Sequence, residues 1–283
     1  MGISGKKILI VGLGLIGGSY ARGLRAAGFE VGALARREET ARYALGHGFV
    51  DSVETEVRKE YVSRFDIVVF CLYPTALVEW IGKWQDCFKP GALITDVSGI
   101  KVPVVYPVQK MLRADLEFIS AHPMAGRELS GVEHSDPSIF RNANYLVVPT
   151  DANTEDAILK CEEIGRILGF GKISRLSPEL HDEMIGFLSQ LTHCIAVSLM
   201  ACKESSHLAE YTGDSFRDLT RIARINDRMW SELFLMNRKE LLSQMDLFEG
   251  QFLKIRKAVE DGDARTLREI MQLSTERRKY FDK

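Results

Sequence analysis

A glycine-rich turn near the start of the chain constrains the fold more than any other feature of the sequence. The apolar run Lys6–Val11 ends in the spacing Gly-x-Gly-x-x-Gly, formed by Gly12, Gly14 and Gly17, and an amphipathic pattern and a second apolar run follow it. Gly12 permits a tight turn, Gly14 lets a pyrophosphate approach the backbone, and Gly17 lets a helix lie close to the strand. This βαβ context predicts a dinucleotide-binding domain. The alternative is a phosphate-free turn in an ordinary α/β domain.

The start of the predicted helix gives this turn a chemical function. Its first N–H groups, which include those of Leu15 and Ile16, lack partners within the helix and lie at the positive end of the helix dipole. We therefore expect the backbone from Gly14 to Gly17 to bind the phosphates of the cofactor.

The end of the second predicted strand bears on the choice of dinucleotide. A site that prefers NAD carries Asp or Glu about 20 residues after the glycine motif, where it binds the adenine ribose. Here that position is Ala35, and Arg36 and Arg37 follow it. Because a guanidinium binds a phosphate through two hydrogen bonds, the sequence favours NADP over NAD. Alternatively, both arginines are simply solvated at the start of a helix.

Length and composition exclude several classes of protein. The 283 residues suffice for two domains with a buried core, and a formal net charge of −2 argues against nucleic-acid binding. We expect no membrane segment, because no apolar run reaches membrane length, and no signal peptide, because the polar start leads directly into a strand. The cysteines form no Cys-x-x-Cys pair and predict reduced thiols in a cytoplasmic protein. They are Cys71, Cys87, Cys161, Cys194 and Cys202.

Strand and helix patterns alternate through the first half of the chain. Such alternation predicts a mostly parallel sheet that is covered by helices on both faces. The predicted strands are Asp66–Leu72, Leu93–Val97, Phe118–Ala121, Tyr145–Val148 and Lys172–Leu176, and the predicted helices are Glu39–His47, Pro74–Trp84 and Thr154–Leu168.

The pattern changes at Ser177 and Pro178, which form a helix start signal. We predict a Rossmann-like α/β dinucleotide-binding domain over residues 1–176 and an all-α dimerisation domain over residues 177–283. Residues 178–204 are apolar around most of the helix circumference and require burial on nearly every side. We expect a second copy to cover them, so that the protein is a homodimer through the helical domain. Further helices are expected at 228–248, 250–261 and 263–280.

Two polar segments follow consecutive predicted strands and form the first candidate site. Asp96–Lys101 follows one strand, and His122 follows the next. In a two-domain nicotinamide enzyme the reaction takes place at the carboxyl ends of the strands. An imidazole titrates near neutrality, so His122 is a candidate general base. The alternative is a histidine that forms a structural hydrogen bond to a neighbouring loop.

Other candidate residues lie in the helical half. His181 stands beside Asp182 in the first turn of the long helix, where capping and function are equally expected. His193 lies on an apolar helix face and by default is a core residue. Several arginines close to Trp230 favour a pocket for an acidic, ring-sized substrate, or else a solvated basic face. No two histidines have metal-ligand spacing beside a carboxylate, so we predict no metal.

With these motifs, the chain resembles the prephenate/arogenate dehydrogenases of tyrosine biosynthesis over nearly its whole length. The His-Pro-x-Ala-Gly and Thr-Arg-Ile-Ala blocks are specific together, whereas either alone is not. The matching segments are Gly12–Gly17, Asp96–Lys101, His122–Glu128, Asn144–Tyr145, Ser189–His193, Phe216–Ala223 and Met229–Trp230.

The resemblance implies a role for several side chains. His122 matches the family's catalytic histidine, which takes the proton of the ring hydroxyl of the substrate. Arg221 matches the arginine that binds a substrate carboxylate. His193 and Trp230 match side chains of the substrate pocket, which replaces the default core interpretation of His193.

Two departures from the family pattern accompany the resemblance. Many members read Asp-x-Gly-Ser-x-Lys, whereas this chain has Ser98 before Gly99, so the serine that assists the catalytic histidine is shifted by one position. Gln190 stands where relatives often carry a second histidine. We retain Ser98 as an expected catalytic residue.

The resemblance implies an NAD(P)-dependent dehydrogenase that converts prephenate into 4-hydroxyphenylpyruvate by oxidative decarboxylation. Arogenate, which would give tyrosine directly, is the alternative substrate. Imine reductases and β-hydroxyacid dehydrogenases share the domain order, but the latter need a lysine on the long helix, and none precedes Lys203 there. A non-catalytic NADP-binding sensor is the remaining alternative, and it would leave His122 and the arginines without a task.

Overall fold

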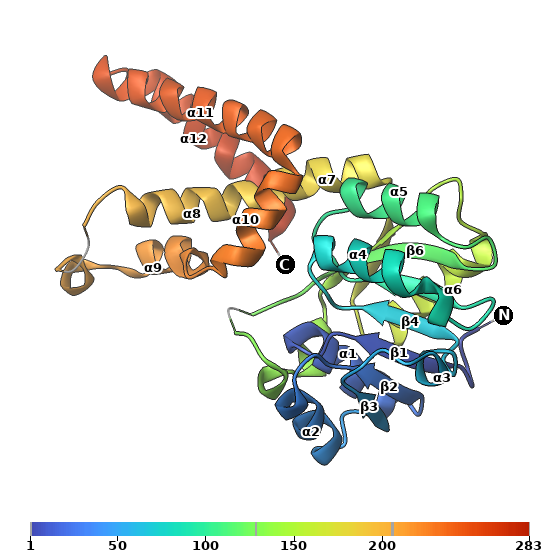
Figure 1. Cartoon of the computed structure of the whole chain (residues 1–283). Helices are drawn as coiled ribbons and strands as arrows, with labels where there is room; N and C mark the ends of the chain where they lie inside the picture. Colours follow the sequence, from blue (N-terminus) through green and yellow to red (C-terminus); the bar gives the residue numbers. More distant parts are fainter. Residues whose placement is uncertain (1, 128, 205–206, 283) are drawn as a thin grey trace.

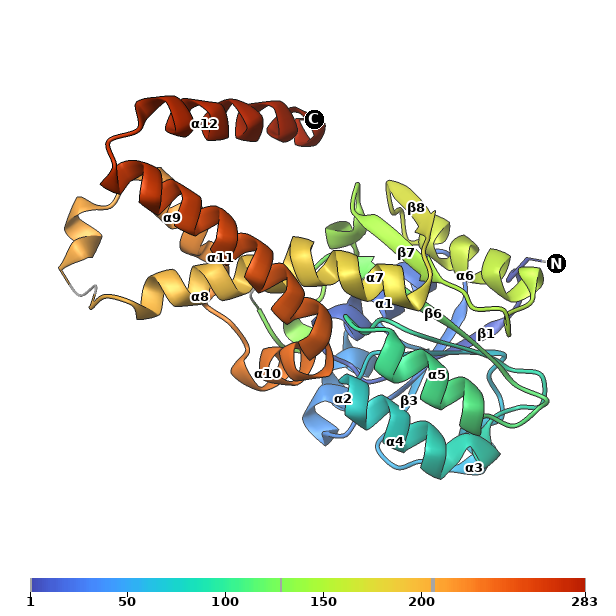
Figure 2. The same cartoon turned by 90° about the horizontal axis from the view of Figure 1, so that it is seen from above.

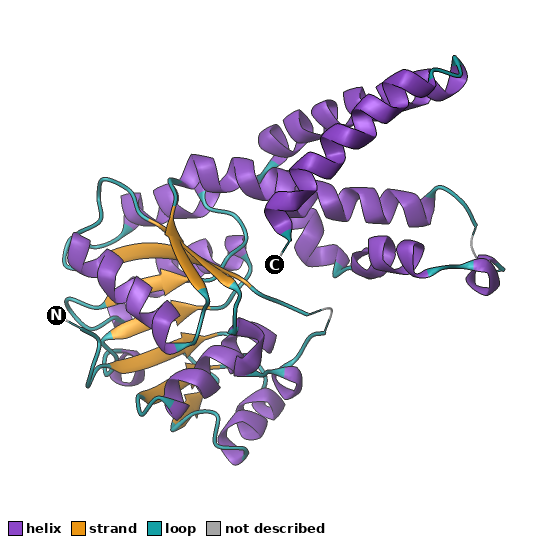
Figure 3. Cartoon of the chain, turned by 180° about the vertical axis from the view of Figure 1, so that it is seen from behind, coloured by secondary structure: helices purple, strands orange, loops and turns teal. Residues whose placement is uncertain are grey.

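A twisted sheet flanked by helices forms the first part of the chain, and helices alone form the second (Figures 1 and 3). The computed structural model describes residues 2–127, 129–204 and 207–282. Glu128, the last residue of the His122–Glu128 motif, lies outside the described residues. Within them the sheet has the strand order β3-β2-β1-β4-β5-β6-β7-β8. The strands are β1 Lys7–Val11, β2 Glu30–Leu34, β3 Ser52–Glu54, β4 Ile67–Phe70, β5 Leu93–Asp96, β6 Glu117–Met124, β7 Asn144–Val148 and β8 Lys172–Arg175.

Helices cover both faces of this sheet, which explains why its central strands are apolar on both sides. Helices α1, α2 and α6 contribute to the core on one face, and α3, α4 and α5 contribute to the core on the other. Strands β1 to β6 are parallel, β7 is antiparallel to β6, and β8 is parallel to β7. The predicted fold class is confirmed. The helices are α1 Leu15–Ala26, α2 Glu38–Gly46, α3 Lys59–Val62, α4 Pro74–Trp84, α5 Val102–Met111 and α6 Glu155–Ile167.

Strand β6 is longer than the sequence predicts. The expected strand ends at Ala121, but β6 continues to Met124 and includes His122, which is paired with Leu146 of β7. The antiparallel partner β7 provides backbone hydrogen bonds over this extension. His122 therefore lies within a paired strand, not at the start of a loop.

The helical part begins with one long helical stretch. Ser177 caps it through a hydrogen bond from Leu180 N–H at 3.2 Å. Helix α7 (Pro178–Ile185) leads through a π-helical turn (Gly186–Leu191) into α8 (Thr192–Ala201). By length and composition alone this stretch could cross a membrane. One such helix is weak evidence, because a buried helix of a globular protein or of a subunit interface has the same composition.

The later helices differ from the prediction at one boundary. The expected helices 228–248 and 250–261 are replaced by α10 (Asp227–Met236) and α11 (Arg238–Glu260), so the break is at Asn237 and not near Gly250. Asn237 Nδ2 donates to Asp182 O at 2.9 Å, and this tertiary contact fixes the break. A glycine inside a helix lowers helix stability by only about 1 kcal/mol relative to alanine, so α11 continues through Gly250.

Helices α11 and α12 (Ala264–Arg278) form a hairpin that projects from the rest of the helical part (Figure 2). Its two helices are joined by a turn at Gly262, which has φ +66°. The hairpin exposes many large apolar side chains. They are Leu242, Leu247, Phe248, Phe252, Leu253, Ile255, Val259, Met271 and Leu273.

Candidate active site

The turn between β1 and α1 has a geometry that requires glycine. Gly12 has φ +98°, and a Cβ there would lie 2.6 Å from Cys71 O. A Cβ on Gly17 would lie 2.0 Å from Gly12 O, so α1 could not approach β1 as closely. At Gly14, by contrast, no described heavy atom lies within 4 Å of an added Cβ. Other atoms of the protein therefore leave no room for a side chain at Gly12 and Gly17, whereas the space beside Gly14 is open.

The first turn of α1 fits an anionic ligand. Gly14 precedes the helix, and the first turn consists of Leu15, Ile16 and Gly17, which bring no carboxylate. The N–H groups at a helix N-terminus point along the axis toward the space beside Gly14. This chain's residues therefore fit the phosphates of a dinucleotide.

Arg36 and Arg37 lie at the carboxyl end of β2, where an adenine ribose would be bound. Both side chains are exposed, and Ala35 before them is buried. Among the residues that the structure describes, neither guanidinium forms an ion pair. Both are available to a phosphate on the ribose.

A buried charged network ties the ends of β5 and β6 together. Lys101 is fully buried, and its Nζ lies 3.0 Å from Asp96 Oδ2. Lys101 Nζ also donates to Ala121 O at 2.6 Å, and Ala121 N–H donates to Asp96 Oδ1 at 3.2 Å. Both backbone groups of Ala121 are thus held in place directly before His122.

Ser98 belongs to this buried network. Its Oγ lies within hydrogen-bond distance of the Asp96 carboxylate, 2.9 Å from Ile100 O and 3.4 Å from Lys101 Nζ. The residue beside His122 is instead Gly99, where an added Cβ would lie 3.8 Å from His122 Cε1. The exchanged Ser-Gly order turns the hydroxyl into the interior. The structure does not bring Ser98 Oγ to His122, and the geometry favours a supporting role for Ser98 through the network.

His122 pairs with a second histidine that comes from the helical part. His122 Nδ1 lies 2.9 Å from His181 Nε2, and His181 Nδ1 lies 2.7 Å from Asp182 Oδ1. His181 is fully buried, whereas His122 is only partly buried. Capping and function were equally expected at His181 from the sequence, because its pairing with His122 joins residues 59 positions apart and leaves no local signal.

Burial keeps both imidazoles neutral. It lowers the pKa of His122 well below the ordinary value, and His181 and Lys101 lower it further. Burial also lowers the pKa of His181, again with a contribution from Lys101. Burial raises the pKa of Asp182 to about 6. The N–H groups of Val102 and Lys101 stabilise the carboxylate and lower this pKa, but the effect of burial is larger. At neutral pH His122 can therefore accept a proton.

Asp182 also joins the two parts of the chain. Its carboxylate accepts hydrogen bonds from Lys101 N–H and Val102 N–H, both at 2.8 Å, and so caps α5 from α7. Gln190, the second departure from the family pattern, is buried and accepts a hydrogen bond from Asn237 Nδ2 at 2.8 Å. Its Nε2 donates to Leu233 O at 3.2 Å. Gln190 therefore connects the long helical stretch to α10 and α11.

The helical part contributes an aromatic pair. His193 of α8 stacks on Trp230 of α10 with ring centroids 3.7 Å apart, and its Nδ1 donates to Ser189 O at 2.8 Å. Arg221 is exposed at the start of a short 3-10 helix (Arg221–Ala223) that packs against α8.

Helix α10 brings this pair toward His122. Leu233, almost one helical turn beyond Trp230, is buried in the core that covers one face of the sheet. An added Cβ on Gly99 would lie 3.6 Å from Leu233 Cδ1 and 3.8 Å from His122 Cε1. Helix α10, which carries Trp230, thus reaches the neighbourhood of Gly99 and His122.

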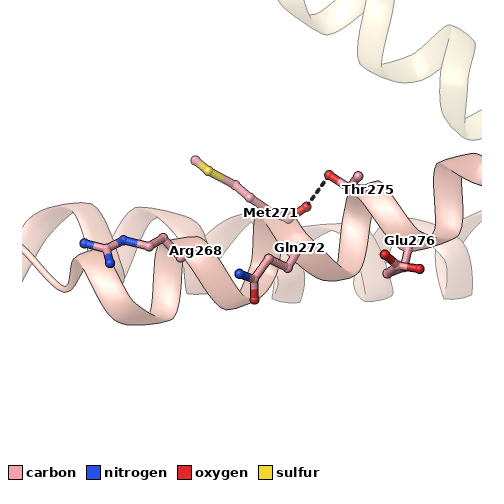
Figure 4. Close-up of a pocket in the computed structure, with 5 residues that line it drawn as sticks. All are labelled: Arg268, Met271, Gln272, Thr275 and Glu276. Carbon is pink, nitrogen blue, oxygen red and sulfur yellow. Dashed lines mark hydrogen bonds between the residues drawn. The ribbon is translucent and has the colours of Figure 1, made fainter.

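A pocket on the last long helix contains none of the predicted site residues. A pocket of about 260 Å³ lies on α12 and is lined by side chains of that helix alone (Figure 4). Within the described ranges, no group of three or more His, Cys, Asp or Glu side chains could hold a metal ion. The pocket-lining residues are Arg268, Met271, Gln272, Thr275 and Glu276.

Comparison with known families assigns the chain. The family described as "Prephenate dehydrogenase, nucleotide-binding domain" matches residues 20–168, and "Prephenate dehydrogenase, dimerization domain" matches residues 177–273. The chain belongs to the prephenate dehydrogenase family. It is therefore an NAD(P)-dependent oxidoreductase of the prephenate/arogenate dehydrogenase type that carries a dimerisation domain, and the resemblance found in the sequence is confirmed.

Individual relatives agree with this assignment. The chain is 29% identical to a cyclohexadienyl dehydrogenase from Zymomonas mobilis, over 91% of this chain and 90% of the relative. It is 30% identical to a prephenate dehydrogenase from Lactococcus lactis, over 94% of this chain and 75% of the relative. The crystal structure of prephenate dehydrogenase from A. aeolicus in complex with hydroxyphenyl propionate and NAD+ has a TM-score of 0.89 at 27% identity and covers 99% of both chains.

Proposed function

We propose that the protein oxidises and decarboxylates prephenate to 4-hydroxyphenylpyruvate, with His122 as the general base. The observation that carries this proposal is the contact of His122, near the end of β6, with His181 of the helical part, whose Nε2 lies 2.9 Å from His122 Nδ1. The Nδ1 of His122 is occupied by His181, which leaves Nε2 for the substrate. Arogenate differs from prephenate in a side chain remote from the reacting hydroxyl, and it is the second candidate substrate.

The residues of this chain support the reaction as follows. When bound, the nicotinamide accepts a hydride from the ring carbon that bears the hydroxyl. His122 Nε2 takes the hydroxyl proton, which lets the carbonyl form. Loss of CO2 from the opposite ring carbon then makes the ring aromatic. The electron pair of the broken C–C bond passes to the ring oxygen, which takes back a proton from His122. Arg221 binds a substrate carboxylate, and the stacked His193 and Trp230 line the pocket for the ring.

The absorbance of reduced nicotinamide tests the proposal directly. The purified protein is mixed with each of the four pairings of prephenate or arogenate with NAD or NADP. Reduction with prephenate at the higher kcat/KM supports the proposal, and a preference for arogenate makes the protein an arogenate dehydrogenase. No reduction in any pairing, while the cofactor still binds, would refute the proposed function.

Replacement of Arg221 by Ala is expected to raise KM for prephenate by about 10- to 100-fold with little change in kcat. A charge-assisted hydrogen bond contributes roughly 1.5–3 kcal/mol to binding, and this one is made equally in the ground state and the transition state. Initial rates over a range of prephenate concentrations measure the effect. Arg238→Ala, an exposed arginine at the start of α11, is the matched control. Equal KM values for the two variants would exclude the role of Arg221.

We propose NADP as the preferred cofactor, on the basis of the two exposed arginines after Ala35. The Arg36→Ala/Arg37→Ala variant is expected to raise Kd for NADP by at least about 10-fold and to leave Kd for NAD unchanged, because only NADP carries the ribose phosphate. Titration calorimetry with both cofactors measures this. Arg42→Ala, on the exposed side of α2, controls for loss of positive charge. A parallel loss of affinity for both cofactors would contradict the assignment.

We propose that a second copy covers the exposed apolar side chains of the long helical stretch and of the α11–α12 hairpin. Phe187 and Phe252 are 52% and 57% exposed in the single chain, which is unusual for side chains of this size. Sedimentation is expected to show twice the chain mass, and Phe252→Asp is expected to shift the protein to monomer. Gln251→Asp, on the same helix, adds the same charge at an exposed polar position and is expected to stay dimeric. A monomeric wild type would overturn this proposal.

We also propose a cytoplasmic location. All five cysteines are free, and burial raises the pKa values of Cys71, Cys87 and Cys161. Thiols that stay reduced and unreactive are typical of proteins in a reducing compartment, which supports this location.

A further inference from the structure

The catalytic histidine is joined to two further side chains in a continuous line of hydrogen bonds. It runs from His122 through His181 to Asp182 at 2.9 and 2.7 Å. We propose that His181 is a positioning residue that fixes the tautomer of His122, with Asp182 as its anchor. The proposal rests on the proposed function, in which His122 is the general base.

The direction of each hydrogen bond follows from the far end of this line. The Asp182 carboxylate accepts hydrogen bonds from two backbone N–H groups, at Lys101 and Val102, both at 2.8 Å. Its pKa of about 6 leaves it ionised above that pH, and an ionised carboxylate can only accept. The Nδ1 of His181 must therefore carry the hydrogen in the contact with Asp182.

The remaining hydrogens are then determined. A neutral imidazole has one donor and one acceptor nitrogen, so His181 Nε2 is an acceptor. The Nδ1 of His122 must donate to it, and the lone pair of a neutral His122 is on Nε2. This is the nitrogen that the proposed function assigns to the substrate hydroxyl. Without an acceptor at His181 Nε2, His122 could place its hydrogen on Nε2 and could not act as a base.

The arrangement also serves the charged state of His122. After His122 takes the proton of the substrate hydroxyl, both of its nitrogens carry hydrogen, and Nδ1–H still donates to His181 Nε2. The proton from the substrate hydroxyl stays on His122 until the ring oxygen takes one back, and His181 keeps its own hydrogen on Nδ1 throughout. His181 orients the ring in both states, as the aspartate of a Ser-His-Asp triad does for its histidine.

Among the described residues, His181 Nδ1 forms a hydrogen bond to Asp182 Oδ1 alone. Lys101 and Asp96 are the charged groups from the β5–α5 side, and they are ion-paired with each other at 3.0 Å. From the helical side, Asn237 Nδ2 donates to the backbone carbonyl of Asp182 and not to its carboxylate.

The tautomer can be measured without substrate and without mutation. Imidazole ¹⁵N NMR of the full-length wild-type protein at pH 7.5, with His122→Asn and His181→Gln spectra for assignment, reports which nitrogen carries hydrogen. We expect hydrogen on Nδ1 of both His122 and His181. Hydrogen on Nε2 of His122 would overturn the proposal, whether or not the enzyme turns over prephenate or arogenate.

Kinetics of two His181 variants test the consequence. The His181→Gln side chain keeps an acceptor close to the position of Nε2, whereas His181→Leu has none. We expect His181→Leu to lower kcat by about 10²- to 10³-fold with KM and cofactor Kd unchanged, because a wrong tautomer in a triad costs up to about 10⁴-fold. His181→Gln is expected to retain kcat within about 10-fold of wild type.

The controls separate positioning from folding. Glu183→Gln neutralises an exposed carboxylate next to Asp182 and is expected to match the wild type. Thermal melts report whether each variant folds, and if His181→Leu does not fold, the NMR tautomer decides. A folded His181→Leu with kcat within threefold of wild type would overturn the proposal. If the wild type is inactive in all four pairings of substrate and cofactor, the proposed function is refuted. The proposal for His181 is then still tested by the NMR tautomer, which needs no turnover.

Discussion

Replacement of His122 by Asn is expected to lower kcat by about 10²- to 10⁴-fold while the affinity for the cofactor is unchanged. A positioned general base contributes this factor, and Asn cannot accept the hydroxyl proton of the substrate. We expect the cofactor phosphates at the β1–α1 turn, so the loss of one imidazole beside the reacting hydroxyl should leave most contacts of the cofactor intact. Initial rates with saturating prephenate, together with titration of the cofactor, measure both quantities.

The control for this variant is His47→Asn. His47 is exposed at the end of α2, where it stacks on Tyr43, and it should be dispensable for turnover. If His122→Asn retained kcat within threefold of wild type, His122 would not be the base.

The pH profile of the wild type adds a second check on His122. A base must be neutral, so activity falls as the pH drops through its pKa. Because burial lowers the pKa of His122, the acid limb of kcat/KM should lie below the ordinary histidine value of about 6.5. An acid limb above that value would contradict the assignment.

The sequence predicted those parts of the fold that depend on local pattern. The glycine spacing, the alternation of strands and helices and the start of the long helix at Ser177 are all local signals. The extension of β6 through His122 was missed because it depends on β7, which pairs from more than twenty residues away. The helix break at Asn237 was missed for the same reason, since its partners are Asp182 and Gln190.

The candidate site likewise contains residues that local sequence pattern predicts and residues that depend on distant contacts. The β1–α1 turn and His122 are marked by spacing and by position after a strand. His181 was not separable from a helix cap, because its partner His122 is brought to it only by the packing of the two parts of the chain. The orientation of Ser98 was also not predictable, because a shift of one residue decides whether its hydroxyl faces His122 or the buried pair Asp96 and Lys101.

The buried ion pair beneath the site carries the second large effect, on stability. Lys101→Met is expected to lower the free energy of unfolding by about 3–5 kcal/mol, because it leaves the carboxylate of Asp96 buried without its cation. For a chain of this size that corresponds to a fall in Tm of roughly 6–20 °C. Both side chains of the pair are fully buried in the native protein.

An exposed pair of the same type provides the comparison. Lys89 Nζ lies 2.6 Å from Asp66 Oδ1, but the lysine side chain is 45% exposed. Water screens this pair, so Lys89→Met should cost at most about 1 kcal/mol. Thermal and urea unfolding of the two variants measure the difference, and equal losses of stability would exclude an unpaired buried charge as the cause.

A second substitution identifies the origin of the loss. If the cost of Lys101→Met is the stranded charge of Asp96, Asp96→Asn in the same chain should restore part of the stability, since a neutral amide is easier to bury than an unpaired carboxylate. If the cost is lost packing of the lysine stem, the second change should lower stability further. Lys101 also donates to Ala121 O, the carbonyl directly before His122. A double variant that regains stability but keeps a low kcat would therefore show that the contacts of Lys101 and Asp96 with Ala121 position the catalytic strand independently of stability.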